Sequence, residues 1–359
     1  MTRPSWVAGV VLAAFAASAC GGSGAGTTLA REPGAPDLAA ATETSAAPTT
    51  VGTPPSTEPP ATTTTTTTVP PPPAPQPAAP QPAALPAPAA PWTVDVYRGL
   101  GTWVDVYDWS QTYTREAAPA VGPQDVDRMA ASGVQTLYIQ ASKWDSPTDV
   151  LEPERLLPII TRAHDLGIRV VAWYLPTFED PATDLRRLLA VASLPVDGLA
   201  VDIESSKVAD PGERSRRLLA VSAELRQALP GRALGAIPYP AVLLDVINPR
   251  LWPGFPWREL APFYDVWLPM SYQTYRTQAS GYRDAYRYAG ENIDRMRVHM
   301  GWLDAPVHVI GGIADKTTWG DVDGIHRAVT ERAGLGASLY DWRTTHPDLW
   351  PALQPYRTP

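Results

Sequence analysis

The sequence predicts an α/β fold, a (β/α)8 TIM barrel preceded by a disordered linker rich in Pro, Thr and Ala. Two observations support this prediction. After Tyr97, short runs of β-branched and aromatic residues alternate with amphipathic stretches of helical length, which is typical of βαβ units around a parallel sheet. Eight such strand candidates fit into the remaining length, and a barrel of this kind typically needs about 250 residues.

The predicted strands follow one another at spacings that leave room for a helix between most of them. They cover Thr102–Trp109, Thr136–Ser142, Arg169–Leu175, Gly198–Glu204, Ala233–Pro238, Val266–Tyr272, Val307–Ile313 and Ala337–Trp342. A doubly wound open sheet is the alternative arrangement for such a pattern. No Gly-rich phosphate turn follows the first strand, which counts against the nucleotide-binding version of that fold.

The predicted helices carry proline near their starts and glycine just past several of their ends, as expected for helix boundaries. They cover Pro123–Ser132, Pro153–Leu166, Asp184–Ala192, Glu213–Leu229, Gly281–Arg297 and Asp321–Arg332. Residues 241–262 are crowded with Pro and Trp and show no clean helical pattern. We therefore expect a long loop after the fifth strand, forming a wall of a cleft.

Residues 1–20 have the pattern of an export signal. Arg3 supplies a positive start, and the apolar run 7–17 is too short to cross a bilayer as a stable helix. The Ala-Ser-Ala sequence before Cys20 allows ordinary cleavage, and it also resembles a bacterial lipoprotein signal, in which Cys20 would be lipidated. We predict an exported protein of the cell envelope, held at the membrane by lipid or secreted.

Residues 21–96 are predicted to form the linker, and residues 97–359 the folded domain. The linker lacks the apolar side chains that offset ordering entropy, and its proline content makes it a stiff, extended spacer. Cys20 is the only cysteine, so the domain contains no internal disulfide and depends on its hydrophobic core.

Composition excludes several classes of function. The net charge of −8 argues against a nucleic-acid partner and gives no polybasic reason to bind anionic lipid, which leaves Cys20 as the route to a membrane. The five histidines show no metal-ligand spacing, so we expect no metal and no other cofactor. There is no Gly-x-Ser-x-Gly elbow. A monomer that acts on a neutral or amino-sugar polymer is compatible with these features.

The segment 197–204, Asp-Gly-Leu-Ala-Val-Asp-Ile-Glu, is the most informative part of the chain. Side chains alternate along a strand, so Asp202 and Glu204 share one face with Ala200, while apolar residues occupy the other face. The apolar face must meet the helices, and the two carboxylates therefore point into the barrel at its C-terminal end, where barrel enzymes carry their active sites. Repulsion and desolvation would raise the pKa of one carboxyl group, as a general acid requires.

This segment resembles the fourth strand of the family 18 glycoside hydrolases, the chitinase-like barrels, which reads Asp-Gly-x-Asp-x-Asp-x-Glu. The resemblance implies that Glu204 donates a proton to the glycosidic oxygen and that Asp202 orients the acetamido group of the substrate, which acts as the nucleophile. Met270-Ser-Tyr272 resembles the Met-x-Tyr of the family, whose Tyr supports that acetamido group. Trp342 stands where the family has a Trp as the floor of a sugar subsite.

The chain departs from this family at several positions. Ala200 replaces the middle Asp of the motif, and Gln273 follows Tyr272 where Asp or Asn is usual. The second strand ends Gln140-Ala-Ser142 instead of carrying the family's Ser-x-Gly-Gly. The resemblance is therefore to a divergent member.

The first strand shows a weaker resemblance to the family 25 lysozymes. Its sequence Trp103-Val-Asp-Val is similar to their Gly-x-Asp-Val opening, and those barrels also carry an Asp-x-Glu on a later strand. Alternation places Asp105 inward, as a third acid near the site. A structural acid bonded to a neighbouring strand is the equal alternative.

Aromatic and polar residues at the predicted strand ends complete the candidate site, because aromatic rings stack on the apolar faces of sugars. The candidate substrate-binding residues are Asp105, Gln140, Tyr174, Tyr239, Met270, Tyr272 and Trp342. We expect a glycoside hydrolase that acts on a cell-wall or N-acetylated polysaccharide such as peptidoglycan or chitin. The alternative is a non-catalytic carbohydrate-binding barrel.

Overall fold

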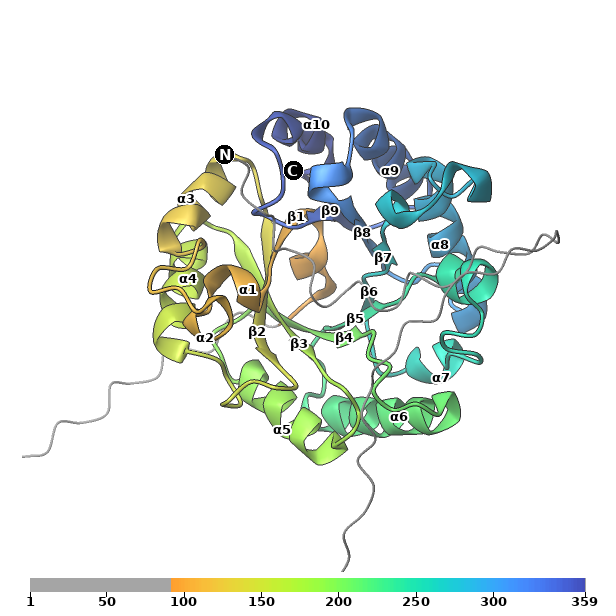
Figure 1. Cartoon of the computed structure of the whole chain (residues 1–359), viewed down its shortest axis with the longest axis horizontal. Helices are drawn as coiled ribbons and strands as arrows, with labels where there is room; N and C mark the ends of the chain where they lie inside the picture. Colours follow the sequence, from red (N-terminus) through yellow and green to blue (C-terminus); the bar gives the residue numbers. More distant parts are fainter. Residues whose placement is uncertain (1–91, 359) are drawn as a thin grey trace, which may run out of the picture. The chain divides into compact units, whose positions relative to one another are not determined.

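The computed structural model describes residues 92–358, and these form a (β/α)8 TIM barrel, as predicted (Figure 1). Its strands are all parallel, and the helices surround them. The strands are β1 (Gly99–Val104), β2 (Thr136–Lys143), β3 (Arg169–Leu175), β4 (Gly198–Ile203), β5 (Leu234–Pro238), β6 (Val266–Trp267), β7 (Met270–Ser271), β8 (His308–Ile313) and β9 (Gly336–Tyr340).

The sixth predicted strand is interrupted, and this interruption closes the barrel. The sheet order runs from β6 through β5, β4, β3, β2, β1, β9 and β8 to β7. The two halves of the predicted sixth strand, β6 and β7, are therefore the first and last strands of the sheet. Only Leu268 and Pro269 separate them in the chain. Trp267 bridges to Val307, and the carbonyl of Pro269 accepts from the amide of Ile310 at 3.2 Å. The β6–β7 segment therefore bonds to neighbours on both sides, as in a closed eight-membered barrel.

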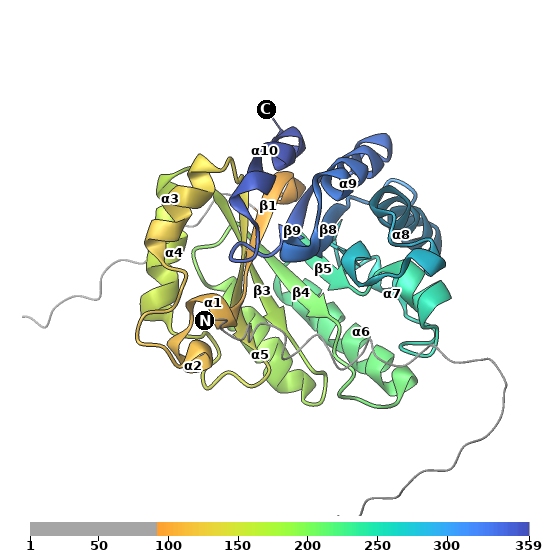
Figure 2. The same ribbon diagram turned by 45° about the horizontal axis from the view of Figure 1, so that its top comes forward.

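Helices form the outer layer, and four of the longer ones begin with a proline in their first turn next to an acidic N-cap or first-turn residue (Figure 2). The α-helices are α1 (Val106–Trp109), α2 (Gln111–Thr114), α3 (Pro123–Ala131), α4 (Pro153–Asp165), α5 (Pro181–Ala192), α6 (Pro211–Ala228), α7 (Trp257–Leu260), α8 (Ala285–Met300), α9 (Trp319–Glu331) and α10 (Trp350–Leu353). The six predicted helices therefore correspond to α3–α6, α8 and α9.

The segment after β5 contains a π-helical turn, Leu243–Ile247, and the short α7 instead of a regular helix. Trp252 is buried there, and its Nε1 donates to Ser215 Oγ of α6 at 2.9 Å. Trp257 packs near Trp267 of β6, with ring centroids 5.9 Å apart. Aromatic side chains thus fill the space that a longer helix would occupy, and the segment belongs to the outer layer.

The first strand is shorter than predicted. It ends at Val104, and Asp105 is the N-cap of α1, accepting a hydrogen bond from the Tyr107 amide at 2.8 Å. The alternating sequence after Val104 is therefore helical, because an Asp at an N-cap satisfies amides that a strand would leave to a neighbour.

Residues 92–96, assigned above to the linker, belong structurally to the barrel domain. The Trp92 Nε1 donates to the carbonyl of Val196, and the Ala233 amide donates to the carbonyl of Trp92, at the N-terminal ends of β4 and β5. The predicted signal (1–20), Cys20 and the remainder of the predicted linker lie outside the described residues. Between residues 92 and 358, no helix combines the length and apolar character that crossing a membrane requires.

The barrel interior is packed with aromatic rings. Trp103 of β1 stacks on Tyr138 of β2 at 4.4 Å between centroids, and its Nε1 donates to Ser338 Oγ of β9 at 2.7 Å. Nearer the N-terminal ends of the strands, His308 of β8 bonds to Ser338 and to the carbonyl of Tyr97. The interior is therefore filled up to the level of Trp103, and chemistry is confined to the C-terminal end.

Candidate active site at the C-terminal end of the barrel

Asp202 and Glu204 lie at the C-terminal end of β4. Asp202 is opposite Ile237 of β5, in the interior row that also contains Ala200 and Gly235, while Leu199, Val201 and Ile203 are buried against the helices. Glu204 follows the last residue of the strand and is half-buried. The alternation predicted from the sequence therefore corresponds to the observed arrangement of β4.

Burial changes the protonation of both carboxyl groups. It raises the pKa of Asp202 well above its usual range, and the charge of Glu204 adds to the effect. It also raises the pKa of Glu204 to about 7. Among the described residues, Asp202 Oδ1 has no hydrogen-bond partner. The pair therefore retains a proton near neutrality and has an acceptor atom free to bind another molecule.

Two tyrosines stand beside the acid pair. The Tyr239 hydroxyl donates to the backbone carbonyl of Glu204 at 2.6 Å, which fixes the chain just after β4. Tyr272 follows β7, and burial, together with the charges of Glu204 and Asp202, raises the pKa of its hydroxyl. Met270 is opposite Ile310, in the row that contains Ser338 on β9, and therefore faces the interior. The structure brings Tyr239, Met270 and Tyr272 to the same end as the acid pair.

Tyr340, which the sequence reasoning did not select, occupies the interior at the end of β9. Its ring lies 6.4 Å from Trp103 and 6.2 Å from Tyr272, and its hydroxyl donates to Asp105 Oδ2 at 2.6 Å. Asp105 thus points toward Tyr340, but as the N-cap of α1 it lies outside the strand from whose alternation an inward position was predicted. Trp342 does not extend the interior row, because the chain turns at Asp341 and Trp342 lies 5.2 Å from Trp350 of α10. Tyr340 is therefore the interior aromatic residue of this strand in place of Trp342.

Trp173, rather than its neighbour Tyr174, faces the barrel interior. Trp173 is opposite Ala200 on β4 and Gln140 on β2, and its ring lies 5.9 Å from Trp103. The Tyr174 hydroxyl donates at 2.5 Å to Asp184 Oδ1 of α5, in the helix layer. Tyr174 thus points away from the site, and the prediction that it contacts the substrate is wrong.

Gln140 faces the interior and holds α1 in place. Its Oε1 accepts from the Val106 amide at 3.2 Å, and its backbone carbonyl accepts from Trp109 Nε1 at 3.0 Å. Asp197, the first acid of the strand-four motif, lies at the opposite end of the barrel. Its Oδ2 accepts from the Val170 amide at 2.7 Å and lies 2.9 Å from His164 Nε2 of α4. Asp197 is therefore a structural residue.

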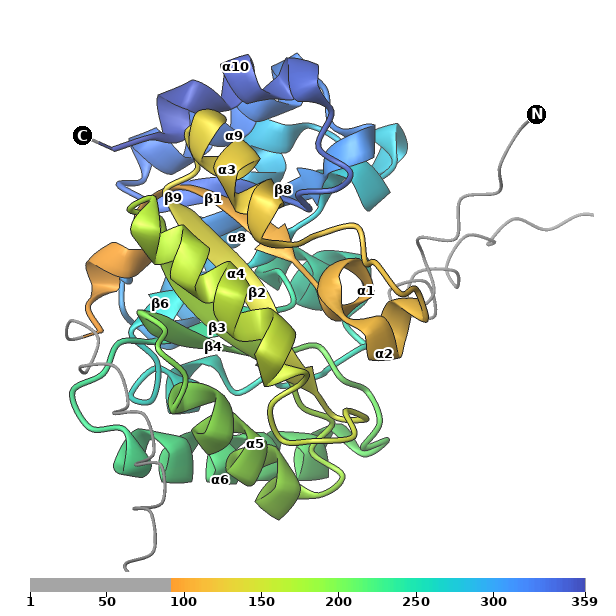
Figure 3. The same cartoon turned by 90° about the vertical axis from the view of Figure 1, so that its left-hand side faces the viewer.

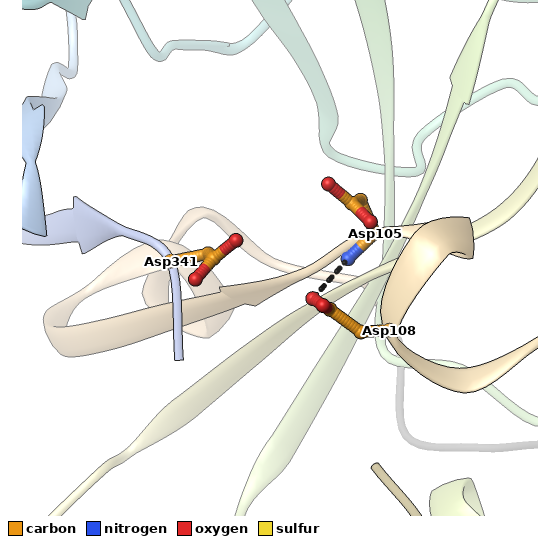
Figure 4. A group of neighbouring side chains, drawn as sticks. All are labelled: Asp105, Asp108 and Asp341. Atoms are coloured by element: carbon orange, nitrogen blue, oxygen red, sulfur yellow. Dashed lines mark hydrogen bonds between the residues drawn. The ribbon is translucent and has the colours of Figure 1, made fainter. Parts of the chain in front are cut away.

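Asp105, Asp108 and Asp341 form an acidic cluster where the ends of β1 and β9 meet (Figure 4). One oxygen of each lies within 4.8 Å of the others, and oxygen clusters of this kind are the ligands that hard cations prefer. Arg343 Nη1 lies 3.1 Å from Asp108 Oδ1 and supplies positive charge to the cluster. Burial is the main cause that raises the pKa values of all three carboxyl groups. The pKa of Asp105 is raised to about 6. Arg343 therefore balances part of the negative charge of the cluster.

Comparison with known proteins supports the fold. The sequence matches no protein-family model, and no curated protein matches it. Among solved structures, the spore cortex-lytic enzyme SleL of Bacillus megaterium superposes with a TM-score of 0.51 and 10% identity, over 73% of this chain and 74% of that chain. A class V chitinase of Pseudomonas fluorescens superposes with a TM-score of 0.52 and 10% identity, over 72% of this chain and 99% of that chain. A family 18 chitinase of Cycas revoluta superposes with a TM-score of 0.53 and 10% identity, over 72% of this chain and 98% of that chain. The chain is thus similar in fold to chitinase-like barrels.

Proposed function

We propose that this protein is a glycoside hydrolase of a cell-wall or N-acetylated polysaccharide, with Glu204 as the general acid. The observation that carries the proposal is the pair of the buried Asp202 and the half-buried Glu204 at the C-terminal end of β4, with the pKa of Glu204 raised to about 7. A glycosidase needs a carboxylic acid that stays protonated near neutrality, next to a second acid. The similarity in fold to chitinases and to a cortex-lytic enzyme supports the same substrate class.

In the proposed reaction, Glu204 gives its proton to the glycosidic oxygen as the bond from that oxygen to the anomeric carbon breaks. The acetamido carbonyl oxygen of the substrate forms a new bond to the anomeric carbon, so the sugar carries a cyclic cation. Asp202 orients the acetamido N–H with its free Oδ1, and the Tyr272 hydroxyl donates to the acetamido group. The Glu204 carboxylate then takes a proton from the water that attacks the anomeric carbon, and the configuration is retained.

One feature favours a non-catalytic carbohydrate-binding barrel as the second candidate. Ala200 stands where a third acid would share a proton with Asp202, and the indole of Trp173 is opposite Ala200 in the register. A barrel that keeps the aromatic surroundings but has lost this acid could retain sugar binding without turnover. The two candidates differ in one observable, which is the release of shorter glycans.

The experiment incubates the purified protein with peptidoglycan and with chito-oligosaccharides, and identifies products by mass spectrometry. We expect wild type to release shorter glycans and Glu204→Gln to lower kcat by about 100-fold to 10,000-fold, the usual contribution of a general acid. Glu259→Gln is the matched control, because Glu259 is exposed on α7. Hydrolysis that survives Glu204→Gln would reject Glu204 as the acid. Binding of both polymers without release by wild type would establish the second candidate.

We also propose that the protein acts at the cell envelope, which is where such polymers occur. This proposal rests on the sequence of residues 1–20, with Cys20 as the lipid attachment site. Cys20→Ser should release the protein from the membrane fraction of expressing cells if lipid anchors it. An unchanged distribution between membrane and medium would favour secretion without lipid.

A further inference from the structure

We propose that Trp144 and Lys207 form a second sugar subsite, which selects a glycan carrying carboxylate groups over a neutral one. This inference deepens the proposed function, since it names the substrate class of the same barrel end. It rests on residues of the loops after β2 and β4, none of which takes part in the reaction steps above. It distinguishes a peptidoglycan-type polymer, whose sugars carry lactyl and peptide carboxylates, from neutral chitin.

Trp144 is exposed on a loop that the rest of the protein holds rigidly. It is 36% exposed, although it directly follows the last residue of β2. Its amide donates to the carbonyl of Leu175 of β3 at 3.0 Å. The buried guanidinium of Arg187 on α5 donates to the carbonyls of Lys143, Trp144 and Ser146, at 2.5 to 2.6 Å. A large apolar ring kept exposed by so many bonds is pre-organised for binding.

Lys207 places a positive charge over this ring. Its Nζ lies 4.7 Å from the Trp144 ring centroid, in the range of a cation–π contact. The residue is exposed, and within residues 92–358 no carboxylate forms an ion pair with it. Lys207 lies three positions after Glu204 in the chain, so the loop that carries the proposed acid also carries this ammonium group. The subsite therefore lies at the same end of the barrel as the proposed reaction centre.

The neighbouring lysine has a different role. Lys143 Nζ is buried, lies 2.8 Å from Asp145 Oδ1 and donates to the Tyr107 hydroxyl at 3.2 Å. Tyr113 donates to the same Asp145 at 2.6 Å. The charge of Lys143 is thus neutralised by Asp145, and Lys143 Nζ lies 5.4 Å from the centroid of the Trp144 ring. Lys207 remains the ammonium group available to a ligand.

Together, these groups match one class of ligand. The exposed indole offers an apolar surface to a pyranose ring, and Lys207 beside it offers a charge-assisted hydrogen bond to a carboxylate on that sugar. A neutral N-acetylglucosamine ring would make the first contact and not the second. The arrangement therefore favours an amino-sugar polymer whose sugars carry carboxylates.

The test measures binding by calorimetry in the Glu204→Gln background, so that hydrolysis does not consume the ligand. The probes are a soluble peptidoglycan glycan strand, the same strand with its carboxylates converted to amides, and a chito-oligosaccharide of equal length. We expect the carboxylate form to bind about fivefold to tenfold more tightly than the amide form, and the difference to shrink as salt rises. Lys207→Gln should remove the difference and leave binding of the two neutral probes unchanged.

Two further variants complete the design. Trp144→Ala should weaken all three probes, and Arg327→Gln should change none, because Arg327 forms a similar cation–ring pair, 4.6 Å from the centroid of Tyr286, on the helix layer. Equal affinity for the carboxylate and amide strands, or a difference that survives Lys207→Gln, would overturn this inference. A protein that shows the preference but never hydrolyses any glycan would refute only the proposed function. Hydrolysis without the preference would refute only the subsite.

Discussion

At the scale of single residues, the molecule concentrates buried and half-buried acids at one end of its barrel. Asp202 and Glu204 form one group, and Asp105, Asp108 and Asp341 form the other, with Tyr340 between Asp105 and Tyr272. Each carboxyl group there loses hydration, so its ionisation costs more than in water. The protein therefore responds to pH in two separate ways, through its chemistry and through its stability.

The chemical response is a loss of activity at high pH. The pKa of Glu204 is raised to about 7, and the acid must be protonated to donate. We expect kcat on the glycan substrate to fall as pH rises through about 7, as general-acid catalysis requires. The measurement is a kcat profile from pH 4 to 9. A rate that stays constant up to pH 9 would contradict Glu204 as the proton donor.

The stability response is expected from the acidic cluster. Burial and mutual repulsion raise its pKa values, so the stability it contributes is present below the unfolded pKa of about 4 and is lost as pH rises past about 6. Asp341→Asn removes one charge but keeps Oδ1, which accepts from Thr344. We expect the variant to be more stable than wild type by on the order of 1 kcal/mol at pH 8, and equal below pH 4. Urea denaturation at both values tests this, and a variant destabilised at pH 8 would show that the third charge is favourable.

At the scale of elements, helices are tied to the starts of strands by side chains at the N-terminal end of the barrel. The side chain of His164, near the end of α4, bonds to the carboxylate of Asp197. The same carboxylate accepts a hydrogen bond from the backbone amide of Val170 in β3. The bond from Asp197 raises the pKa of His164. Because the folded pKa is raised, this stabilisation is complete below the unfolded value of about 6.5 and disappears as pH rises through the folded value.

His164→Gln should therefore destabilise the protein more at pH 5.5 than at pH 9. The histidine side chain is 34% exposed, so we expect a difference of a few tenths to about 1 kcal/mol between the two conditions. Chemical denaturation of wild type and variant at both pH values gives this difference. A destabilisation independent of pH would mean that packing, and not charge, accounts for the contact.

The sequence was sufficient to place the acid pair but not all of its neighbours. β4 alternates between polar and apolar residues at its end, so the faces of Asp202 and Glu204 could be assigned. β3 is apolar on both faces, as strands of parallel sheets are, and nothing in its own sequence distinguishes Trp173 from Tyr174. The distinction comes from register, because Trp173 is opposite Ala200.

Local irregularities explain the remaining differences. β2 has a register shift between Gln140 and Ser142, which brings Lys143 to the interior side, and single-sequence alternation cannot reveal such a bulge. The chain turns at Asp341, so the last interior aromatic of β9 is Tyr340 and not Trp342. The strand positions were predictable because they follow from hydrophobic runs. Contacts that depend on bulges and turns were not.

At the scale of the whole molecule, residues 92–97 close the barrel at the N-terminal ends of its strands. The buried Tyr97 hydroxyl donates its one proton to the carbonyl of Leu199 at 2.8 Å, in a bond shared with the carbonyl of Ala233 at 3.2 Å. It therefore connects the 3-10 turn before β1 to β4 and to the residue before β5 across the interior. Figure 3 shows α1 and α2 at the end of the barrel opposite to this segment.

Tyr97→Phe should lower the free energy of unfolding by about 1–3 kcal/mol, because it leaves buried carbonyls with fewer donors. Tyr286→Phe is the control, since the hydroxyl of Tyr286 bonds to Glu331 at the surface. Urea denaturation of both variants gives the comparison. Equal stability of Tyr97→Phe and wild type would show that the shared hydrogen bond contributes little, and the N-terminal end of the barrel would then be held by packing alone.

The position of Trp92 determines at which end of the barrel the preceding chain is connected to the domain. The chain enters the barrel beside Val196 and Ala233, and Thr358 near the other terminus bonds to Gln135, also at the N-terminal ends of the strands. Any load carried along the backbone from the preceding residues would be received by β4 and β5 at that end. Glu204 and Trp144 lie at the opposite ends of the strands, so Trp92 and Thr358, the two ends of the described chain, both lie away from the proposed reaction centre.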